Sequence, residues 1–158
     1  NCRGKEILFN PEGYVVASVN AQDLKSVILN LVVNALDSME ETGKLTIKLG
    51  TKNGLAEMSF TDTGCGMPAD VLENIFEPFF TRSRTGKGTG LGLFISHQII
   101  DQHGGTLQAS SAGPGKGSTC TVRVPLEARQ ADSETGRPGD YTEARETVLA
   151  FPGSRVAA

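Results

Sequence analysis

The sequence has no tryptophan, and it has only three cysteines and two histidines among its 158 residues. Cys2, Cys65 and Cys120 lie far apart and form no CxxC pair, which argues against a structural zinc site. This cysteine usage favours reduced thiols in a cytoplasmic protein. His97 and His103 are the only imidazoles, and a cysteine-based metal site would need them as partners.

Excess positive charge and long apolar runs are also absent. Fifteen basic residues stand against 18 acidic ones, and the net charge of −3 has the wrong sign for a nucleic-acid-binding protein. No apolar run approaches the roughly 20 residues that a membrane span needs, and no signal peptide opens the chain. We expect no nucleic-acid partner and no membrane contact by this segment. Because it starts at Asn1 without methionine, we expect a longer parent, which can be anchored elsewhere.

The residues present are typical of one globular domain followed by a tail. Apolar residues make up 38% of the chain, and 158 residues are enough for one buried core. After Pro125 the sequence carries scattered charges, glycine and proline, with few grouped apolar residues. We therefore predict a folded domain over residues 1–126 and a poorly ordered tail or linker over 127–158, with at most a short helix near 141–150.

Hydrophobic periodicity predicts an α+β fold. Two alternating segments separated by Asn10-Pro11-Glu12-Gly13 indicate strand, turn and strand, and apolar residues at three- and four-residue spacing indicate a long helix ended by Gly43. Asn53-Gly54 is a strong hairpin signal. The expected strands are 5–9, 14–19, 44–50, 55–61, 106–110 and 118–125, and the expected helices are 21–41, 68–76 and 91–103. This order favours a two-layer sandwich, with helices on one face of a largely antiparallel sheet.

A polar stripe follows the long helix opposite its apolar face. Asp23, Asn30, Asn34, Asp37 and Glu41 fall within about 60° of one another on a helical wheel. Such a stripe is often only a solvated face. Asparagine, however, is a poor residue for an exposed helix interior because its amide competes with the backbone. An amide-oxygen pair at this spacing suits Mg²⁺, which takes oxygen ligands and keeps several waters.

Two glycine-rich segments follow strands or precede helices. Asp62-Thr63-Gly64-Cys65-Gly66-Met67 is either a strand-ending turn or a site where the carboxylate accepts a hydrogen bond from an adenine amino group. Residues 86–93 are either a flexible surface loop or a phosphate-binding loop at a helix N-terminus. In the second case the cations of Arg82, Arg84 and Lys87 lie on the same loop, within residues 80–90.

Taken in order, these segments resemble the ATP-binding domain of sensor histidine kinases. The stretches that carry the resemblance are NLVVNALDSM, DTGCGM, FEPFFT at residues 76–81, GTGLGL and the closing HGGTLQASSAGPGKGSTCTVRVP. The resemblance covers about residues 5–126. The sensor histidine kinases belong to a superfamily that they share with DNA gyrase, MutL proteins and a heat-shock chaperone. It implies a Bergerat-type ATP-binding fold, a mixed and mostly antiparallel sheet covered on one face by helices, and a flexible ATP lid at residues 81–89.

The resemblance also implies roles for individual residues. Asn34 is expected to be the principal Mg²⁺ ligand, Asn30 to contact the metal or the phosphates, and Asp62 to bind adenine. Asn30, Asn34 and Lys87 are the expected catalytic residues. The other residues expected to bind the nucleotide are Asp37, Gly64, Gly66, Met67, Phe79, Phe80, Thr81, Arg82, Lys87, Gly88, Thr89, Gly90, Leu91, Gly92, Leu93 and Thr119.

The residue type at position 30, which is Asn30 in this chain, distinguishes enzymes that transfer phosphate from those that hydrolyse ATP. The hydrolases of the superfamily have a glutamate there as general base, and an amide cannot accept a proton. We therefore expect Mg-ATP to be held for a histidine on a separate dimerisation and phosphoacceptor domain, with a response regulator as indirect partner. We expect the isolated domain to be a monomer and the parent a homodimer. His97 and His103 do not fit the acceptor pattern and are predicted to be structural.

Two alternatives remain at this point. The first is a protein-serine kinase of the same fold. The second is a non-catalytic binding module that uses the nucleotide only as a conformational switch. The sequence also departs from the family at Asp37, where many members have a lysine or arginine. At Asp37 a phosphate contact is either missing or replaced by Arg82, Arg84 or Lys87, or Asp37 instead joins the outer shell of the metal.

Overall fold

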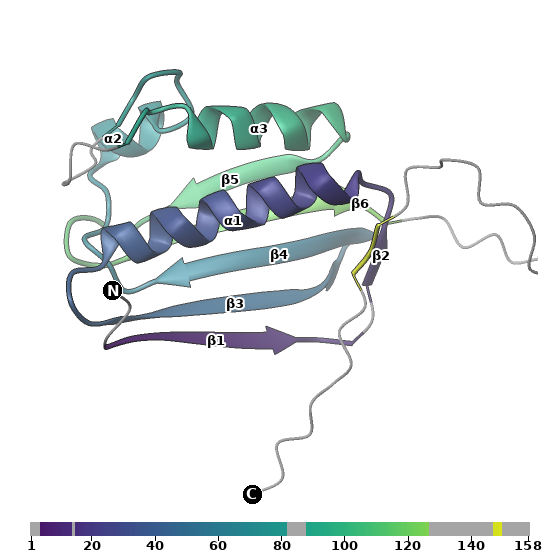
Figure 1. The fold of residues 1–158 in the computed structure, drawn as a ribbon, viewed down its shortest axis with the longest axis horizontal. Helices are drawn as coiled ribbons and strands as arrows, with labels where there is room; N and C mark the ends of the chain where they lie inside the picture. Colours follow the sequence, from purple (N-terminus) through teal and green to yellow (C-terminus); the bar gives the residue numbers. More distant parts are fainter. Residues whose placement is uncertain (1–3, 14, 82–87, 127–146, 150–158) are drawn as a thin grey trace, which may run out of the picture.

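The computed structural model describes residues 4–13, 15–81, 88–126 and 147–149. Figure 1 shows the arrangement of the elements, which follow the order ββαββααβββ along the chain. They are β1 (Lys5–Pro11), β2 (Val15–Ala17), α1 (Ala21–Ser38), β3 (Gly43–Lys52), β4 (Leu55–Asp62), α2 (Ala69–Asn74), α3 (Gly92–Gln102), β5 (Thr106–Ser110), β6 (Ser118–Pro125) and β7 (Thr147–Leu149).

Five strands form the main sheet in the order β1-β3-β4-β6-β5. β1 pairs with β3 in parallel, and the other three pairings are antiparallel. α1 and α3 lie side by side over one face of this sheet (Figure 1). The predicted two-layer α+β sandwich with a mixed, mostly antiparallel sheet is therefore confirmed.

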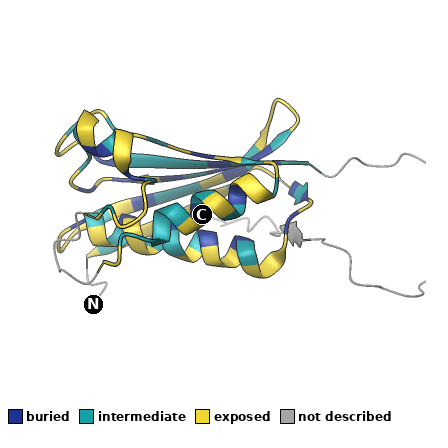
Figure 2. Ribbon diagram, turned by 90° about the horizontal axis from the view of Figure 1, so that it is seen from above, coloured by how far each residue is buried: buried dark blue, intermediate teal, exposed yellow. Residues whose placement is uncertain are grey.

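The core lies between the two layers, where Figure 2 shows the buried residues of the sheet and of the helices. On the central strand β4, Ala56, Met58 and Phe60 alternate inward, and Phe60 is only 2% exposed. Burial of one such large side chain stabilises the fold by about 1.5–3 kcal/mol. The facing residues of α1 recur at three- and four-residue spacing, as expected for an amphipathic helix: Leu24, Val27, Leu31 and Ala35.

Glycines shape two turns, and the first of them was predicted from the sequence. Asn53 and Gly54 have φ values of 52° and 74°, the pair of positive values that a tight type I′ hairpin requires between β3 and β4. At the end of α3, Gly104 has φ of 70°, and the amide of Gly105 donates to the carbonyl of Ile100 at 2.9 Å. That bond caps the helix as a Schellman-type ending does.

The predicted strand, turn and strand at the start of the chain are present as β1, residues 12–13 and β2. The two strands do not pair with each other, because β1 pairs with β3 and the amide of Glu12 donates to the carbonyl of Leu49 at 2.7 Å. The predicted end of the long helix was wrong. The long helix ends at Ser38, and Gly43 is the first residue of β3 and not a helix cap. The tertiary contacts of Ser38 described below explain the early end.

Strand β2 pairs antiparallel with β7, which comes from the C-terminal part of the chain. The sequence predicted at most a short helix near 141–150, but Thr147–Leu149 is a strand whose ladder depends on β2. The rest of residues 127–158 lies outside the described residues. Among the described residues, no helix is long and apolar enough to cross a bilayer.

Candidate functional site

Asp62 closes β4 on the helix-covered face of the sheet. The alternation that buries Met58 and Phe60 carries its carboxyl inward, and the residue is only 8% exposed. Its Oδ1 accepts hydrogen bonds from the amide of Gly64 at 2.8 Å and from the Oγ of Ser38 at 3.1 Å. Burial raises the pKa of Asp62, and these hydrogen bonds oppose the rise. The result is a buried carboxylate held in one orientation.

The loop after Asp62 has no room for side chains at its glycines. A Cβ on Gly64 would lie 2.1 Å from the Oγ of Ser38, and one on Gly66 would lie 2.1 Å from the carbonyl oxygen of Gly113. Gly66 also has φ of 64°, a conformation that favours glycine. Both glycines are therefore required by the close approach of Ser38 and of the Gly113 backbone.

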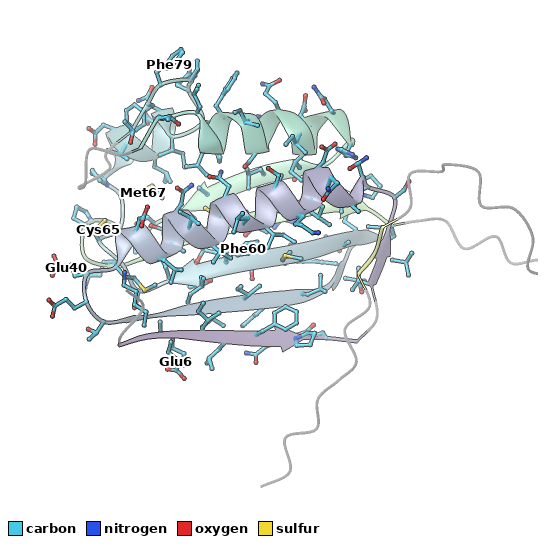
Figure 3. The ribbon with its side chains drawn as sticks, viewed as in Figure 1. Glu6, Glu40, Phe60, Cys65, Met67 and Phe79 are labelled. Carbon is cyan, nitrogen blue, oxygen red and sulfur yellow. The ribbon has the colours of Figure 1, made fainter. Side chains whose placement is uncertain are left out.

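The same loop is fixed from two sides. On one side the amide of Cys65 donates to the carbonyl of Ser38 at 2.9 Å. On the other side, within the β5–β6 turn, Gly115 donates to the carbonyl of Cys65 at 2.6 Å, and the Oγ of Ser111 accepts from the amide of Met67 at 2.9 Å. Figure 3 shows Cys65 and Met67 beside the C-terminal end of α1. The loop is thus a rigid part of the site.

The polar stripe of α1 leads from this loop to the start of α3. Asn30, Asn34 and Ser38 follow one another at four-residue spacing, so they share a face and span about 12 Å at 1.5 Å per residue. At the far end, Nδ2 of Asn30 donates to the Oγ of Ser96 at 2.8 Å, and a Cβ on Gly92 would lie 2.4 Å from Oδ1 of Asn30. Asn34 lies between the two ends and is exposed.

The N-terminus of α3 provides backbone donors at the Asn30 end of this line. Leu91 is its N-cap and contributes no side-chain cap, and the first turn holds no acidic residue. The first amides of a helix lack intrahelical partners and carry positive potential, which suits an anion such as phosphate. Thr89 Oγ1 accepts from the amide of Leu91 at 3.4 Å, and Leu93 packs against the core.

The segment that leads into the predicted lid is strained. Phe79 has φ of 66° and is 75% exposed, and a Cβ on Gly90 would lie 2.5 Å from the carbonyl carbon of Phe79. Phe79 and Gly90 therefore bring the two ends of the predicted lid together, although Phe79 itself points outward (Figure 3). Phe80 is half-buried, and Thr81, Gly88 and Thr89 are exposed. Arg82, Arg84 and Lys87 lie outside the described residues.

Among the predicted site residues that the structure describes, Thr119 lies away from Asp62 and the polar face of α1. It pairs with Thr61, and their hydroxyls lie 3.0 Å apart on the face of the sheet that α1 does not cover. Its neighbour Ser118 pairs with Asp62 instead, and the backbone of Ser118 hydrogen-bonds the Asp62 carboxyl. The described residues at this site that the sequence interpretation missed are Ser38, Ser96, Ser111 and Ser118. Asp37 is exposed on α1, beside Ser38.

Both histidines make structural contacts, in line with the sequence interpretation. Nε2 of His103 accepts from the amide of Asn20 at 3.1 Å, so Nδ1 carries the proton and donates to the carbonyl of Ile99 at 2.7 Å. This pair of bonds joins the end of α3 to the start of α1. His97 lies against Phe76, with ring centroids 5.0 Å apart.

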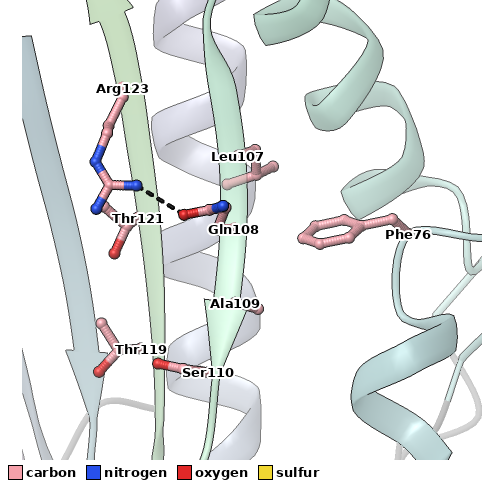
Figure 4. A pocket seen from close by; sticks show the side chains of 8 residues that line it. All are labelled: Phe76, Leu107, Gln108, Ala109, Ser110, Thr119, Thr121 and Arg123. Carbon is pink, nitrogen blue, oxygen red and sulfur yellow. Dashed lines mark hydrogen bonds between the residues drawn. The ribbon is translucent and has the colours of Figure 1, made fainter. Parts of the chain in front are cut away.

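A cavity of about 500 Å³ lies at the edge strand β5, apart from Asp62. Figure 4 shows Phe76 facing Leu107 and Ala109 on one side of β5, and the guanidinium of Arg123 bonded to Gln108 on the other. Thr119 is the only predicted site residue in its lining. The cavity therefore belongs to the sheet edge and not to the line along α1.

Comparisons with known proteins agree with this geometry. Residues 19–128 match the family described as histidine kinase-, DNA gyrase B-, and HSP90-like ATPase. The sensor histidine kinase ZraS of Escherichia coli (strain K12) is 40% identical over 111 residues, which are 70% of this chain and 23% of that protein. Sensor kinase CckA of Brucella abortus (strain 2308) is 42% identical over 127 residues, 68% of this chain and 13% of that one.

Solved structures give the same family. A mycobacterial sensor histidine kinase, MprB, superposes with a TM-score of 0.68 at 28% identity, covering 77% of this chain and 82% of that one. The catalytic domain of histidine kinase ThkA superposes with a TM-score of 0.68 at 31% identity, covering 77% and 80%. The chain thus belongs to the histidine kinase-, DNA gyrase B- and HSP90-like ATPase family, as an ATP-binding catalytic domain of the histidine-kinase branch.

Proposed function

We propose that this chain binds Mg-ATP and transfers the γ-phosphate to a histidine on a separate domain of its parent. The observation that carries the proposal is the row of polar side chains along α1, formed by Asn30, Asn34 and Ser38. Asp62, fixed by Ser38 at one end, suits an adenine amino group, and the N-terminus of α3 beside Asn30 at the other end suits phosphate. The span of about 12 Å between these ends matches an extended nucleotide.

Asn34 fits a magnesium ion at the middle of this line. Its side chain is exposed, and its amide oxygen is a hard, uncharged ligand. Among the described residues, no group of three His, Cys, Asp or Glu side chains could hold a metal alone. A Mg²⁺ ion at Asn34 would therefore take most of its ligands from phosphate oxygens and water, as it commonly does, and would neutralise phosphate charge.

Asn30 supports transfer over hydrolysis. Its NH₂ group is committed to Ser96 and its oxygen packs against Gly92, so the residue supplies no base for an attacking water. In phosphoryl transfer the protein mainly positions the groups and offsets their charge. We infer that α1 and α3 hold the nucleotide in place until an external imidazole approaches, with Lys87 and Arg82 as lid cations toward the phosphates.

The acceptor lies on another part of the parent in this proposal. The chain spans about a quarter or less of the curated relatives that it matches. The partners we propose are a dimerisation and phosphoacceptor domain directly and a response regulator indirectly, in a cytoplasmic, homodimeric parent. The isolated chain would then be a monomer that binds ATP without phosphorylating itself.

Incubation with γ-labelled ATP, Mg²⁺ and the phosphoacceptor domain of a sensor histidine kinase tests the proposal. We expect label on the acceptor that is lost in acid, because phosphohistidine is acid-labile and phosphoserine is not. Asn34→Ala should reduce the rate by at least about tenfold, since it removes a group that positions charge at the reacting phosphate. Lys25→Ala, an exposed change on the same helix, serves as the matched control.

Three results would count against the proposal. Acid-stable label would indicate a serine kinase of the same fold. Nucleotide binding that is unaffected by Asn34→Ala, together with no transfer, would indicate a binding module. Rapid ATP turnover by the chain alone would show that the site activates water.

A further inference from the structure

Ser38 joins the end of α1 to the buried carboxyl of Asp62, 24 residues further along the chain. Its Oγ lies 3.1 Å from Oδ1 of Asp62 and 2.8 Å from the carbonyl oxygen of Ala35. The same Oγ sits over Gly64, where an added Cβ would come within 2.1 Å of it. The hydroxyl therefore fills the space that the missing side chain of Gly64 leaves beside the carboxyl.

When Asp62 is ionised, its carboxylate is the preferred acceptor for the hydroxyl proton of Ser38. A serine hydroxyl has a single proton, and both Ala35 and Asp62 present acceptors. A carboxylate is the stronger acceptor, so the proton points to Oδ1. Oδ1 then receives two donors, Ser38 and the amide of Gly64 at 2.8 Å. Oδ2 takes neither of these two bonds, and because a carboxylate oxygen has two lone pairs it can accept a donor from a ligand beside the backbone contact of Ser118.

We propose that Ser38 is a positioning residue that determines base specificity. It holds Oδ1 so that Oδ2 meets the exocyclic amino group of adenine, and it makes the chain select adenine nucleotides over purine nucleotides that lack this group. The inference rests on the proposed ATP site and adds to it a residue that does not touch the nucleotide itself. Its effect should appear only when the amino group is present.

The test compares ATP with purine riboside triphosphate, which has hydrogen in place of the amino group. Dissociation constants are measured by calorimetry with Mg²⁺ for the full 158-residue chain and for Ser38→Ala. We expect Ser38→Ala to weaken ATP binding about tenfold, the effect of one lost hydrogen bond to a charged group, and to leave the analogue unchanged. Ser26→Ala, an exposed serine of α1, is the matched control and should change neither constant.

Other outcomes of this test would contradict either the role of Ser38 or the proposed function. If Ser38→Ala weakens both ligands equally, Ser38 only supports the fold, and if it weakens neither, the hydroxyl has no role in binding. Unchanged binding of the analogue also shows that the variant is folded. If the unchanged chain binds no ATP at all, the proposed function itself fails, and this result is distinct from a loss of selectivity in a chain that binds.

Discussion

The amide of Asn30 on α1 donates to the hydroxyl of Ser96 on α3, with 2.8 Å between Nδ2 and Oγ. Ser96 is only 2% exposed, so this bond joins the two helices inside the covered layer. It also fixes which atoms of Asn30 face Gly92 and the start of α3. A residue expected from the sequence to contact metal or phosphate is therefore also part of the packing between helices.

Removal of the Ser96 hydroxyl should destabilise the chain measurably. Ser96→Ala leaves the NH₂ group of Asn30 without its partner, and we expect a loss of about 1 kcal/mol in the free energy of unfolding. Denaturant titration measures it, with the exposed Ser26→Ala within about 0.5 kcal/mol of the wild type as control. Equal stability of the two variants would show that the bond between the helices contributes nothing.

Gly64 should tolerate no side chain. In Gly64→Ala the new Cβ would lie 2.1 Å from the Oγ of Ser38 and 2.8 Å from Oδ1 of Asp62. The overpacking should cost about 1–3 kcal/mol of stability and weaken ATP binding. Gly50→Ala is the matched control, because its new Cβ would meet only the flexible end of Glu12, at 3.0 Å. A stable Gly64→Ala chain with normal ATP affinity would contradict the described packing.

Replacement of Asp62 should have one effect on the stability of the fold and a different effect on ATP binding. Burial raises the pKa of Asp62 above its ordinary value of 3.8. Between pH 3.8 and the raised pKa, the folded chain therefore keeps a proton on Asp62 that the unfolded chain has released. The contribution of Asp62 to the free energy of unfolding is fully present below pH 3.8 and is lost as the pH rises through the raised pKa.

Asp62→Asn keeps an oxygen for Gly64 and Ser38 but removes the charge. We expect its stability relative to the wild type to be greater at pH 7 than at pH 4, as measured by denaturant titration at both values. ATP affinity should fall by at least about tenfold, since an amide NH₂ facing the adenine amino group replaces an acceptor with a donor. If the relative stability were the same at both pH values, the carboxyl would not be protonated in this window.

Much of the fold follows from local pattern, because the signals lie within a few residues. Asn53 and Gly54 alone favour the positive φ values of the hairpin, and the inward alternation of β4 predicts which face Asp62 shares. The end of α1 is different. It is set by Ser38, whose partners Asp62 and Cys65 come from another part of the chain. No pattern within the helix carries that information.

The register of the sheet separates Thr119 from Asp62. Ser118 and Thr119 are neighbours of similar chemistry, and a shift of one residue moves a side chain to the other face of a sheet. Only the pairing of Ser118 with Asp62 shows which of them faces the helices. The β2–β7 pairing was missed for a related reason, since three residues have too little pattern to predict a partner 134 positions away, as in the pair Val15 and Leu149.

His103 should be replaceable without loss of phosphate transfer. His103→Ala removes the acceptor for the amide of Asn20 and the donor to Ile99, so we expect a loss of about 1–3 kcal/mol in stability. Transfer to a supplied acceptor domain, measured where the variant is fully folded, should stay within about twofold of the wild type. A complete loss of labelled product from a folded variant would mean that His103 takes part in the chemistry.

The four-residue spacing along α1 sets the distance between the two ends of the proposed nucleotide site. The contact to α3, the proposed metal ligand and the contact to Asp62 lie one helical turn apart, at Asn30, Asn34 and Ser38. One residue inserted between Asn30 and Asn34 would rotate everything beyond it by about 100°. Such a change would turn Ser38 away from Asp62 although no site residue was altered. Evolution of this helix is therefore constrained in length as well as in composition, and indels should be far less tolerated there than in the surface turn at Asn53.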